Sequence, residues 1–363
     1  CPSSVDMAKI KIEFLDRYHR ANGTPLRARF FASAARQARR YSGRIAPLVN
    51  KIAAKESVRR MIERVFGISR KRTLPPFARE PFDKWFKKHQ KQTKNGQNNG
   101  ATPSASPRPR VVLFNDTFNT YHYPEVARAA TQVLEAFGFD VILPGHKCCG
   151  RPALSKGLVS LARKYASDTL DHLVGFAREG LPIIGLEPSC ILSFDDEYHS
   201  LLPGDPRVPL VAERAILFDD FVASLDPATL PPMSGYGEVL LHGHCHQKAA
   251  VGTGGTHRAL EAVKGCSVNE IDAGCCGMAG SFGFEKEHYD LSMQIGKLRL
   301  FPAIQATPRH ATIVAPGVSC RQQISQGTGR KALHTAEVLF RSLIRARQDA
   351  ERAQKQESAQ RQV

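Results

Sequence analysis

Short apolar runs alternate with longer amphipathic stretches through residues 111–340. Runs of five to seven residues rich in Val, Ile and Leu are typical of buried parallel strands, whereas the stretches between them have apolar residues at helical spacing. The predicted strands cover residues 111–115, 139–143, 182–187, 238–244, 267–271 and 311–316. The predicted helices cover residues 125–137, 158–178, 257–263 and 286–300. Strands separated by helices of this length predict parallel βαβ units.

The chain before residue 111 has a different pattern. Residues 5–66 have helical spacing, with predicted breaks at residues 23–25 and at Pro47. Their apolar stripe has Arg and Lys on the opposite face, and it comprises Ile45, Leu48, Val49, Ile52, Met61, Ile62 and Val65. The predicted organisation is a basic helical segment over 1–89, a flexible Gly- and Pro-rich linker over 90–110, a first repeat over 111–235, a second repeat over 236–340 and a polar tail over 341–363.

Charge divides the chain at the same place. Residues 1–110 contain 26 Lys and Arg against 7 Asp and Glu, whereas the rest contains 25 against 27. The net charge of +17 therefore belongs to the N-terminal segment, and the nearly neutral remainder argues against a nucleic-acid-binding protein. An anionic membrane surface is a candidate partner for this basic segment.

Two cysteine motifs recur along the chain. Cys-Cys-Gly at residues 148–150 returns at residues 275–277, 127 positions later, and Cys190 returns as Cys320, 130 positions later. In both copies the motif follows a predicted strand, and the later cysteine follows the next one. We therefore predict an α/β fold of two duplicated, Rossmann-like βαβ lobes preceded by a basic helical arm, with the thiols at the carboxyl ends of the strands.

The second repeat contains four such thiols, at Cys245, Cys275, Cys276 and Cys320. Four sulfur ligands can hold an iron-sulfur cluster or a tetrahedral zinc ion. An adjacent cysteine pair suits a multi-iron cluster better than the C-x2-4-C knuckles of structural zinc sites. Simple burial of the thiols, a dithiol or vicinal disulfide centre at Cys275 and Cys276, and zinc remain alternatives at this point.

The first repeat has an incomplete set of cysteines. Cys148, Cys149 and Cys190 are present, but the position that corresponds to Cys245 falls within residues 115–118, which contain no cysteine. Asp116 is the candidate oxygen ligand there. Near Cys245 itself, His242, His244 and His246 alternate along the predicted strand, which places the three imidazoles on one face and Cys245 on the other.

These motifs resemble the cysteine-rich CCG domain over about residues 111–340. That domain occurs twice in heterodisulfide reductase B subunits and in the iron-sulfur subunits of glycolate oxidase, anaerobic glycerol-3-phosphate dehydrogenase and lactate-utilisation systems. The resemblance implies cluster ligands at Cys245, Cys275, Cys276 and Cys320, and at Cys148, Cys149 and Cys190. The C-x-x-C that usually ends each repeat of the reductases is replaced by Glu187-Pro-Ser-Cys190 and Gly317-Val-Ser-Cys320, a departure that argues against disulfide reduction.

The first residues carry a second resemblance. Cys1-Pro2, followed by a helical pattern, is similar to the end of the bacterial ferredoxin motif C-x2-C-x2-C-x3-C-P. Cys1 would then ligate a 4Fe-4S cluster together with cysteines upstream of this sequence. A ferredoxin module joined to two CCG repeats is similar to the tail of long flavoproteins.

The resemblances together imply a function. They indicate the electron-transfer portion of an FAD-linked oxidoreductase of the D-lactate, glycolate or D-2-hydroxyglutarate class, which passes electrons to a quinone or another carrier. The expected cofactor is a 4Fe-4S cluster, with FAD and the carbon chemistry on a partner flavoprotein domain or subunit. The expected location is the cytoplasm, peripherally at the inner face of the cytoplasmic membrane. A heterodisulfide-reductase-like thiol enzyme and a zinc-stabilised interaction module are the alternatives.

Overall fold

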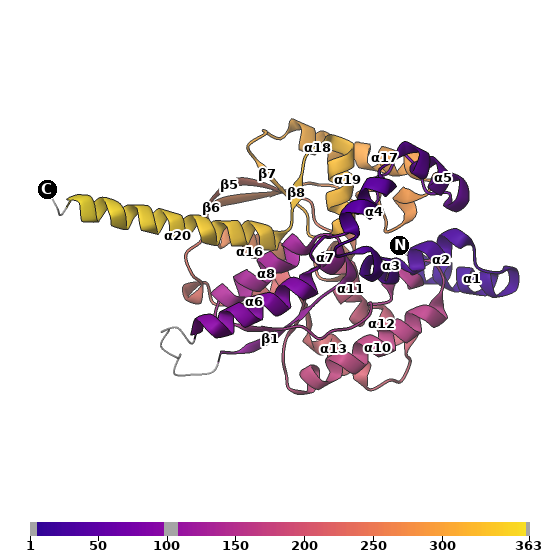
Figure 1. The fold of residues 1–363 in the computed structure, drawn as a ribbon, viewed down its shortest axis with the longest axis horizontal. Helices are drawn as coiled ribbons and strands as arrows, with labels where there is room; N and C mark the ends of the chain where they lie inside the picture. Colours follow the sequence, from indigo (N-terminus) through magenta and orange to yellow (C-terminus); the bar gives the residue numbers. More distant parts are fainter. Residues whose placement is uncertain (1–5, 98–107, 361–363) are drawn as a thin grey trace.

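The computed structural model describes residues 6–97 and 108–360 and places them in two lobes, each built on a four-stranded sheet (Figure 1). The first sheet has the order β2-β1-β3-β4 and comprises β1 (Arg110–Phe114), β2 (Asp140–Ile142), β3 (Ile183–Gly185) and β4 (Ala215–Leu217). The second has the order β6-β5-β7-β8 and comprises β5 (Ser234–Leu241), β6 (Lys264–Glu270), β7 (Thr312–Val314) and β8 (Ala332–Leu333). All neighbouring strands are parallel, and the matching order confirms the predicted duplicated Rossmann-like α/β lobes.

Helices cover the faces of both sheets. Those of the first lobe are α7 (Thr117–Tyr121), α8 (Pro124–Ala136), α9 (Arg151–Leu154), α10 (Val159–Arg178), α11 (Pro188–Ile191), α12 (Glu197–Leu201), α13 (Arg207–Arg214) and α14 (Phe218–Ala223). Those of the second are α15 (Cys245–Ala250), α16 (Gly254–Glu261), α17 (Tyr289–Leu298), α18 (Leu300–Ala306), α19 (Val318–Thr328) and α20 (Thr335–Gln360). Short 3₁₀ turns are η1 (Leu192–Phe194), η2 (Pro227–Thr229) and η3 (Phe282–Phe284).

Strand β1 shows why the apolar runs form central strands. Val112 and Phe114 pack into one hydrophobic cluster, whereas Val111 and Leu113 pack into another on the opposite face of the sheet. Successive side chains of a strand point to opposite faces, so a strand covered on both faces must be apolar throughout. Strands β4 and β8 were not predicted, because three and two residues are too short to give a recognisable run.

The last helix joins the two lobes. Ala336, Leu339 and Leu343 of α20 belong to the same buried cluster as Val126 and Val133 of α8, although α20 follows the last strand of the second lobe. Helix α20 then continues outward as a long exposed helix (Figure 1). Residues 341–360 of the predicted polar tail are therefore helical, and residues 361–363 lie outside the described part.

A buried carboxylate lies at this junction of the lobes. Asp219 of α14 accepts hydrogen bonds from the hydroxyls of Thr256 in α16, at 2.6 Å, and Thr335 in α20, at 3.0 Å. Its other oxygen has no partner among the described residues. Burial raises the pKa of Asp219 to about 6.

This shift predicts a pH dependence of stability. The pKa of Asp219 in the folded protein lies above its unfolded value near 3.8. The contribution of this carboxyl to the stability of the fold is therefore complete below pH 3.8, and it is lost as the pH rises through about 6. We expect Asp219→Asn to become more stable relative to the natural protein by about 2 kcal/mol between pH 4.5 and 7.5. Urea unfolding at both pH values measures this. The control is Asp195→Asn, whose side chain is 86% exposed, and parallel pH profiles for Asp219→Asn and the natural protein would contradict the prediction.

The basic N-terminal segment packs across both lobes instead of extending from them. It comprises α1 (Met7–Asn22), α2 (Leu26–Ala32), α3 (Ala34–Tyr41), α4 (Ala46–Ala53), α5 (Glu56–Phe66) and α6 (Phe82–Gln97). Phe82 and Phe86 are buried in the core of the first lobe, while Ile68 joins a buried cluster of the second. Helix α1 contacts α10, α2 contacts α9 and α3 contacts α7, all in the first lobe.

The predicted linker is described only in part. Residues 90–97 continue helix α6, residues 108 and 109 lead into β1, and residues 98–107 lie outside the described part. The breaks between α1 and α2 and between α3 and α4 leave residues 23–25 and 42–45 outside helices, and Pro47 lies in the first turn of α4. Within 6–97 and 108–360, no helix is both long enough and apolar enough to span a bilayer.

Candidate metal centre

The four second-lobe cysteines lie at the carboxyl edge of the second sheet. Cys245 is the first residue of α15 after β5, Cys275 and Cys276 lie in the loop after β6, and Cys320 lies in the first turn of α19 after β7. Parallel strands all end at the same edge of a sheet, which is why residues so far apart in the chain meet there.

The four sulfurs form a continuous chain of contacts. Cys245 shares a hydrogen bond with Cys275, Cys275 with Cys276, and Cys276 with Cys320. This sharing lowers the pKa of Cys275 to about 2 and that of Cys320 well below its usual range, and it raises the pKa values of Cys245 and Cys276. Cys276 and Cys320 are buried, whereas Cys245 is exposed at the edge. Two of the thiols are thereby held toward the thiolate form that binds metals.

The backbone conformation explains why a glycine follows the two cysteines in the Cys-Cys-Gly motif. Gly277 has a φ of +93°, and a Cβ added there would lie 2.3 Å from the carbonyl oxygen of Ser292. Its backbone N–H donates to the Cys275 sulfur at 3.3 Å. Only glycine therefore permits the turn that presents both cysteines and supplies this hydrogen bond.

The predicted alternation of histidines around Cys245 is wrong. Strand β5 ends at Leu241 and helix α15 begins at Cys245, so residues 242–244 form a connecting turn. His242 is fully buried, its ring lies within 4.8 Å of the sulfurs of Cys276 and Cys320, and neither ring nitrogen bonds a described nitrogen or oxygen atom. The imidazole of His242 thus faces the sulfurs.

The other two histidines differ from His242. The ring of His244 packs on Gly317, where an added Cβ would lie 2.3 Å from its Cδ2 atom. The imidazole therefore fills the space of a side chain at position 317. His246 lies 3.5 Å from a carboxylate oxygen of Asp196, and burial lowers its pKa to about 4.

The first-lobe cysteines form a smaller group. The sulfurs of Cys149 and Cys190 are 3.1 Å apart, and Cys148 hydrogen-bonds Cys149, so the three buried thiols meet. Asp116 caps helix α7: it accepts from the backbone N–H groups of Phe118 and Asn119 and from the Asn119 amide. Burial raises the pKa of Asp116 to about 6. Both oxygens of Asp116 are thus already engaged as a helix cap.

Two further cysteines stand apart from these groups. Cys1 lies outside the described residues. Cys266 lies within β6, half-buried beside apolar residues of the core, and burial raises its pKa to about 11.

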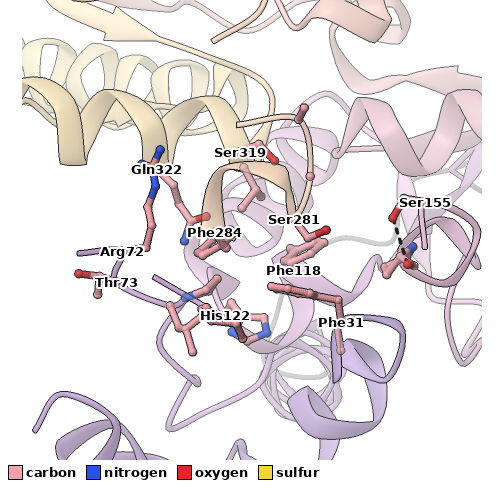
Figure 2. Close-up of a pocket in the computed structure, with 18 of the residues that line it drawn as sticks. Phe31, Arg72, Thr73, Phe118, His122, Ser155, Ser281, Phe284, Ser319 and Gln322 are labelled. Carbon is pink, nitrogen blue, oxygen red and sulfur yellow. Dashed lines mark hydrogen bonds between the residues drawn. The ribbon is translucent and has the colours of Figure 1, made fainter. Parts of the chain in front are cut away.

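A cavity of about 750 Å³ opens beside the cysteines, between the two lobes and the N-terminal segment. The second-lobe cysteines and Cys190 line one end of it. Aromatic and apolar residues line much of the rest, together with polar residues that include four arginines, and Figure 2 shows Phe31, Phe118 and Phe284 gathered there with Ser281 and Ser319. The N-terminal segment contributes Phe30, Phe31, Ile62, Ile68, Leu74 and Phe77 to the lining.

Two residues that the sequence did not single out connect the walls of this cavity. The buried carboxylate of Glu187, in the first lobe, accepts from the backbone N–H of Val318 at 2.8 Å and from the Ser189 hydroxyl at 2.7 Å. Arg72, in the N-terminal segment, donates to the Gly283 carbonyl at 2.7 Å and to the Ser292 hydroxyl at 2.6 Å. In the sequence, Glu187 could have been noticed because it replaces a cysteine of the related motif. Nothing distinguished Arg72 from the other arginines of its basic stretch.

The donor set fits an iron-sulfur cluster. Four thiols joined in a chain of contacts supply the soft ligands that iron-sulfur clusters require, and N–H donors beside the sulfurs are the groups that tune such a centre. Gly277 donates to the Cys275 sulfur, and the buried ring of His242 faces the sulfurs of Cys276 and Cys320. The second-lobe group is the more complete one, because the first has three thiols and a carboxylate that is occupied in capping a helix.

Comparisons with known proteins agree with this geometry. The sequence is 28% identical over 304 residues to the C subunit of anaerobic glycerol-3-phosphate dehydrogenase of Escherichia coli K12, covering 82% of this chain and 72% of that protein. It is 26% identical over 342 residues to D-2-hydroxyglutarate dehydrogenase of the same organism, covering 94% of this chain but 33% of that protein. It is 26% identical over 243 residues to lactate utilization protein A of Halalkalibacterium halodurans, covering 63% of this chain and 96% of that protein.

The family comparison identifies the repeats themselves. The cysteine-rich CCG domain matches residues 114–195 and again residues 239–325. These two segments contain all seven cysteines of the two sulfur groups, and they run from the last residues of β1 and β5 to beyond β3 and β7. The cysteine-rich domain and its relatives support iron-sulfur binding by this chain. Each lobe of the chain therefore contains one segment that matches the cysteine-rich CCG domain.

Proposed function

We propose that this chain is the electron-transfer portion of an FAD-linked oxidoreductase, with a 4Fe-4S cluster held by Cys245, Cys275, Cys276 and Cys320. The observation that carries the proposal is the contact chain of these four sulfurs at one end of a large cavity. A bound cluster would accept and release single electrons. The chain contributes the ligands, the burial of Cys276 and Cys320 and the N–H of Gly277, each of which influences the reduction potential.

The proposed substrate is a 2-hydroxy acid of the D-lactate, glycolate or D-2-hydroxyglutarate class, oxidised on a partner flavoprotein domain or subunit that carries FAD. The relatives, which include a D-2-hydroxyglutarate dehydrogenase and a lactate utilization protein, support this class. An unpartnered apolar stripe on α1 offers a surface for such a partner. Its members, between 49% and 66% exposed, are Met7, Ile10, Phe14 and Tyr18.

The remaining cysteines have proposed roles as well. Cys148, Cys149 and Cys190 form a second, incomplete metal site in the first lobe. Cys1 is proposed as a ligand of a ferredoxin-type cluster. We place the protein in the cytoplasm, with its basic N-terminal segment against anionic lipid at the inner face of the membrane. Electrons would pass onward to a quinone or another carrier.

Metal analysis of the anaerobically purified protein tests the proposal. We expect about four irons and four acid-labile sulfides per chain from the second-lobe site, with visible absorption that bleaches on reduction and an EPR signal of the reduced state. A larger iron content would assign metal to the first-lobe cysteines too. Stoichiometric zinc without sulfide, or turnover of a disulfide by metal-free protein, would contradict the proposal.

A further inference from the structure

The cavity beside the cysteines is larger than the metal centre requires. Its volume of about 750 Å³ lies within the range of small-molecule binding sites. The thiols line one part of it, and apolar residues of the N-terminal segment such as Phe30, Phe31 and Leu74 line another part. A redox centre at one end and an apolar wall at the other suit a ligand that is itself lipophilic and redox-active.

The charges around the cavity argue against an anionic ligand. Four arginines line it, and each already has a protein acceptor: Arg59 bonds the carbonyl of Arg72, Arg70 pairs with Glu56 and Glu63, and Arg151 pairs with Glu197. Arg72 is the most buried of them, and its donors reach Gly283, Ser292 and Gln326.

The carboxylate that lines the cavity has a different setting. Glu187 lines the cavity with backbone and hydroxyl donors as its partners and no cation among the described residues. A ligand that bears a carboxylate would therefore meet the Glu187 anion, and it would have to compete for Arg59 and Arg72 with the protein acceptors that these arginines already bond. A neutral ligand is favoured.

Two hydroxyls are placed to receive such a ligand. Ser281 and Ser319 line the cavity close to the cysteines, and neither side chain hydrogen-bonds another described residue. Figure 2 shows both beside the rings of Phe118 and Phe284. Free hydroxyls beside aromatic rings suit a flat ring that carries carbonyl oxygens.

We propose that this cavity binds a neutral, lipophilic quinone, with its ring at the cysteine end and its tail along the N-terminal wall. This inference rests on the proposed electron-transfer function and locates its terminal acceptor within this chain. The quinone takes up two electrons, delivered singly through the metal centre from the reduced flavoprotein partner, together with two protons from water. The quinol then leaves, and the partner is reoxidised.

The mouth of the cavity is consistent with a ligand that arrives from a bilayer. Ala53, Ala54 and Ile62 of the α4–α5 region line the cavity, and the neighbouring Ile52, Met61 and Val65 are between 43% and 57% exposed. The same helices present Lys51, Lys55, Arg60 and Arg64 to solvent. Exposed apolar side chains among cations are typical of surfaces that sit on anionic lipid.

A cavity-filling variant tests the site. Ala34→Phe adds a ring to the cavity wall on α3, and Ala53→Phe does so near the mouth. We expect each to weaken binding of decylubiquinone to the anaerobically prepared holoprotein by about tenfold or more, measured by calorimetric titration. The matched control is Ala350→Phe on the exposed end of α20, which should bind as the natural protein does. Iron content and far-UV circular dichroism report whether centre and fold are intact in each variant.

The outcomes separate this inference from the proposed function. An iron-loaded natural protein that binds no decylubiquinone would overturn the quinone site and leave the electron-transfer function standing, whereas iron-free protein would defeat the function itself. Equal binding by the natural protein, Ala34→Phe and Ala53→Phe would assign the quinone to an exposed apolar surface and overturn the site. A shift of the cluster EPR signal on addition of decylubiquinone, lost in both filling variants, would support it.

Discussion

Replacing Cys276 with serine is expected to abolish the iron of the second-lobe centre. Cys276 is buried and is the member of the group that contacts both Cys275 and Cys320. A serine hydroxyl is a hard and weakly acidic ligand, so it does not replace a thiolate on iron. We expect a loss of about four irons per chain, together with the visible absorption and the EPR signal, measured on anaerobic preparations.

The chain contains a matched control for this variant. Cys266 is a half-buried cysteine of the same lobe that lies in β6, away from the group, so Cys266→Ser should keep its iron. Equal iron in Cys276→Ser and the natural protein would refute the assignment. If Cys276→Ser and Cys266→Ser lost the same amount of iron, the cause would be misfolding of the lobe. Cys276 would then have no specific role as a ligand.

Arg72→Met is expected to destabilise the protein by about 2–4 kcal/mol. The Arg72 guanidinium is 2% exposed and joins the N-terminal segment to the second lobe through the Gly283 carbonyl, the Ser292 hydroxyl and the Gln326 amide oxygen. Methionine would leave the buried Gly283 carbonyl without the Arg72 donor, and it would leave the Ser292 hydroxyl with only the long contact from the Gln323 amide at 3.4 Å. Burial of the cation lowers the pKa of Arg72, so part of the loss is offset by the relief of that desolvation.

Urea unfolding followed by far-UV circular dichroism measures this loss, and a neighbouring arginine supplies the comparison. The Arg70 side chain is 46% exposed and makes only long ion pairs with Glu56 and Glu63, so Arg70→Met should change the free energy of unfolding by no more than about 0.5 kcal/mol. If the two variants were equally stable, Arg72 would not be a link between the segment and the lobe.

The lobes were predictable because local pattern and tertiary environment agree there. The run that forms β1 is apolar at every position after Arg110, and both faces of the strand are buried. Repetition of the Cys-Cys-Gly motif then located both sulfur groups, since the strand ends of a parallel sheet coincide. Strands β4 and β8 escaped prediction because they depend on neighbouring strands more than on their own residues.

The cavity was not predictable, because its far wall depends on contacts between distant parts of the chain. Arg70, Lys71 and Arg72 are consecutive basic residues, yet Arg72 alone is buried. Periodicity identified helices in residues 5–66 but gave no indication that they would cover the cysteines. The position of His242 was missed for a related reason: the strand ended earlier than its apolar pattern suggested, so the alternation of side chains did not extend to the histidines.

The N-terminal wall sets the order in which the protein can be assembled. The N-terminal segment leaves the ribosome before the two lobes, but the second-lobe residues that anchor it are made much later: Arg27 pairs with Glu285, and Arg72 bonds Ser292. The segment must therefore wait undocked until both lobes have folded. During that interval the cysteine edge is uncovered, which gives a cluster-delivering factor access to Cys276 and Cys320, two thiols that are buried in the finished protein.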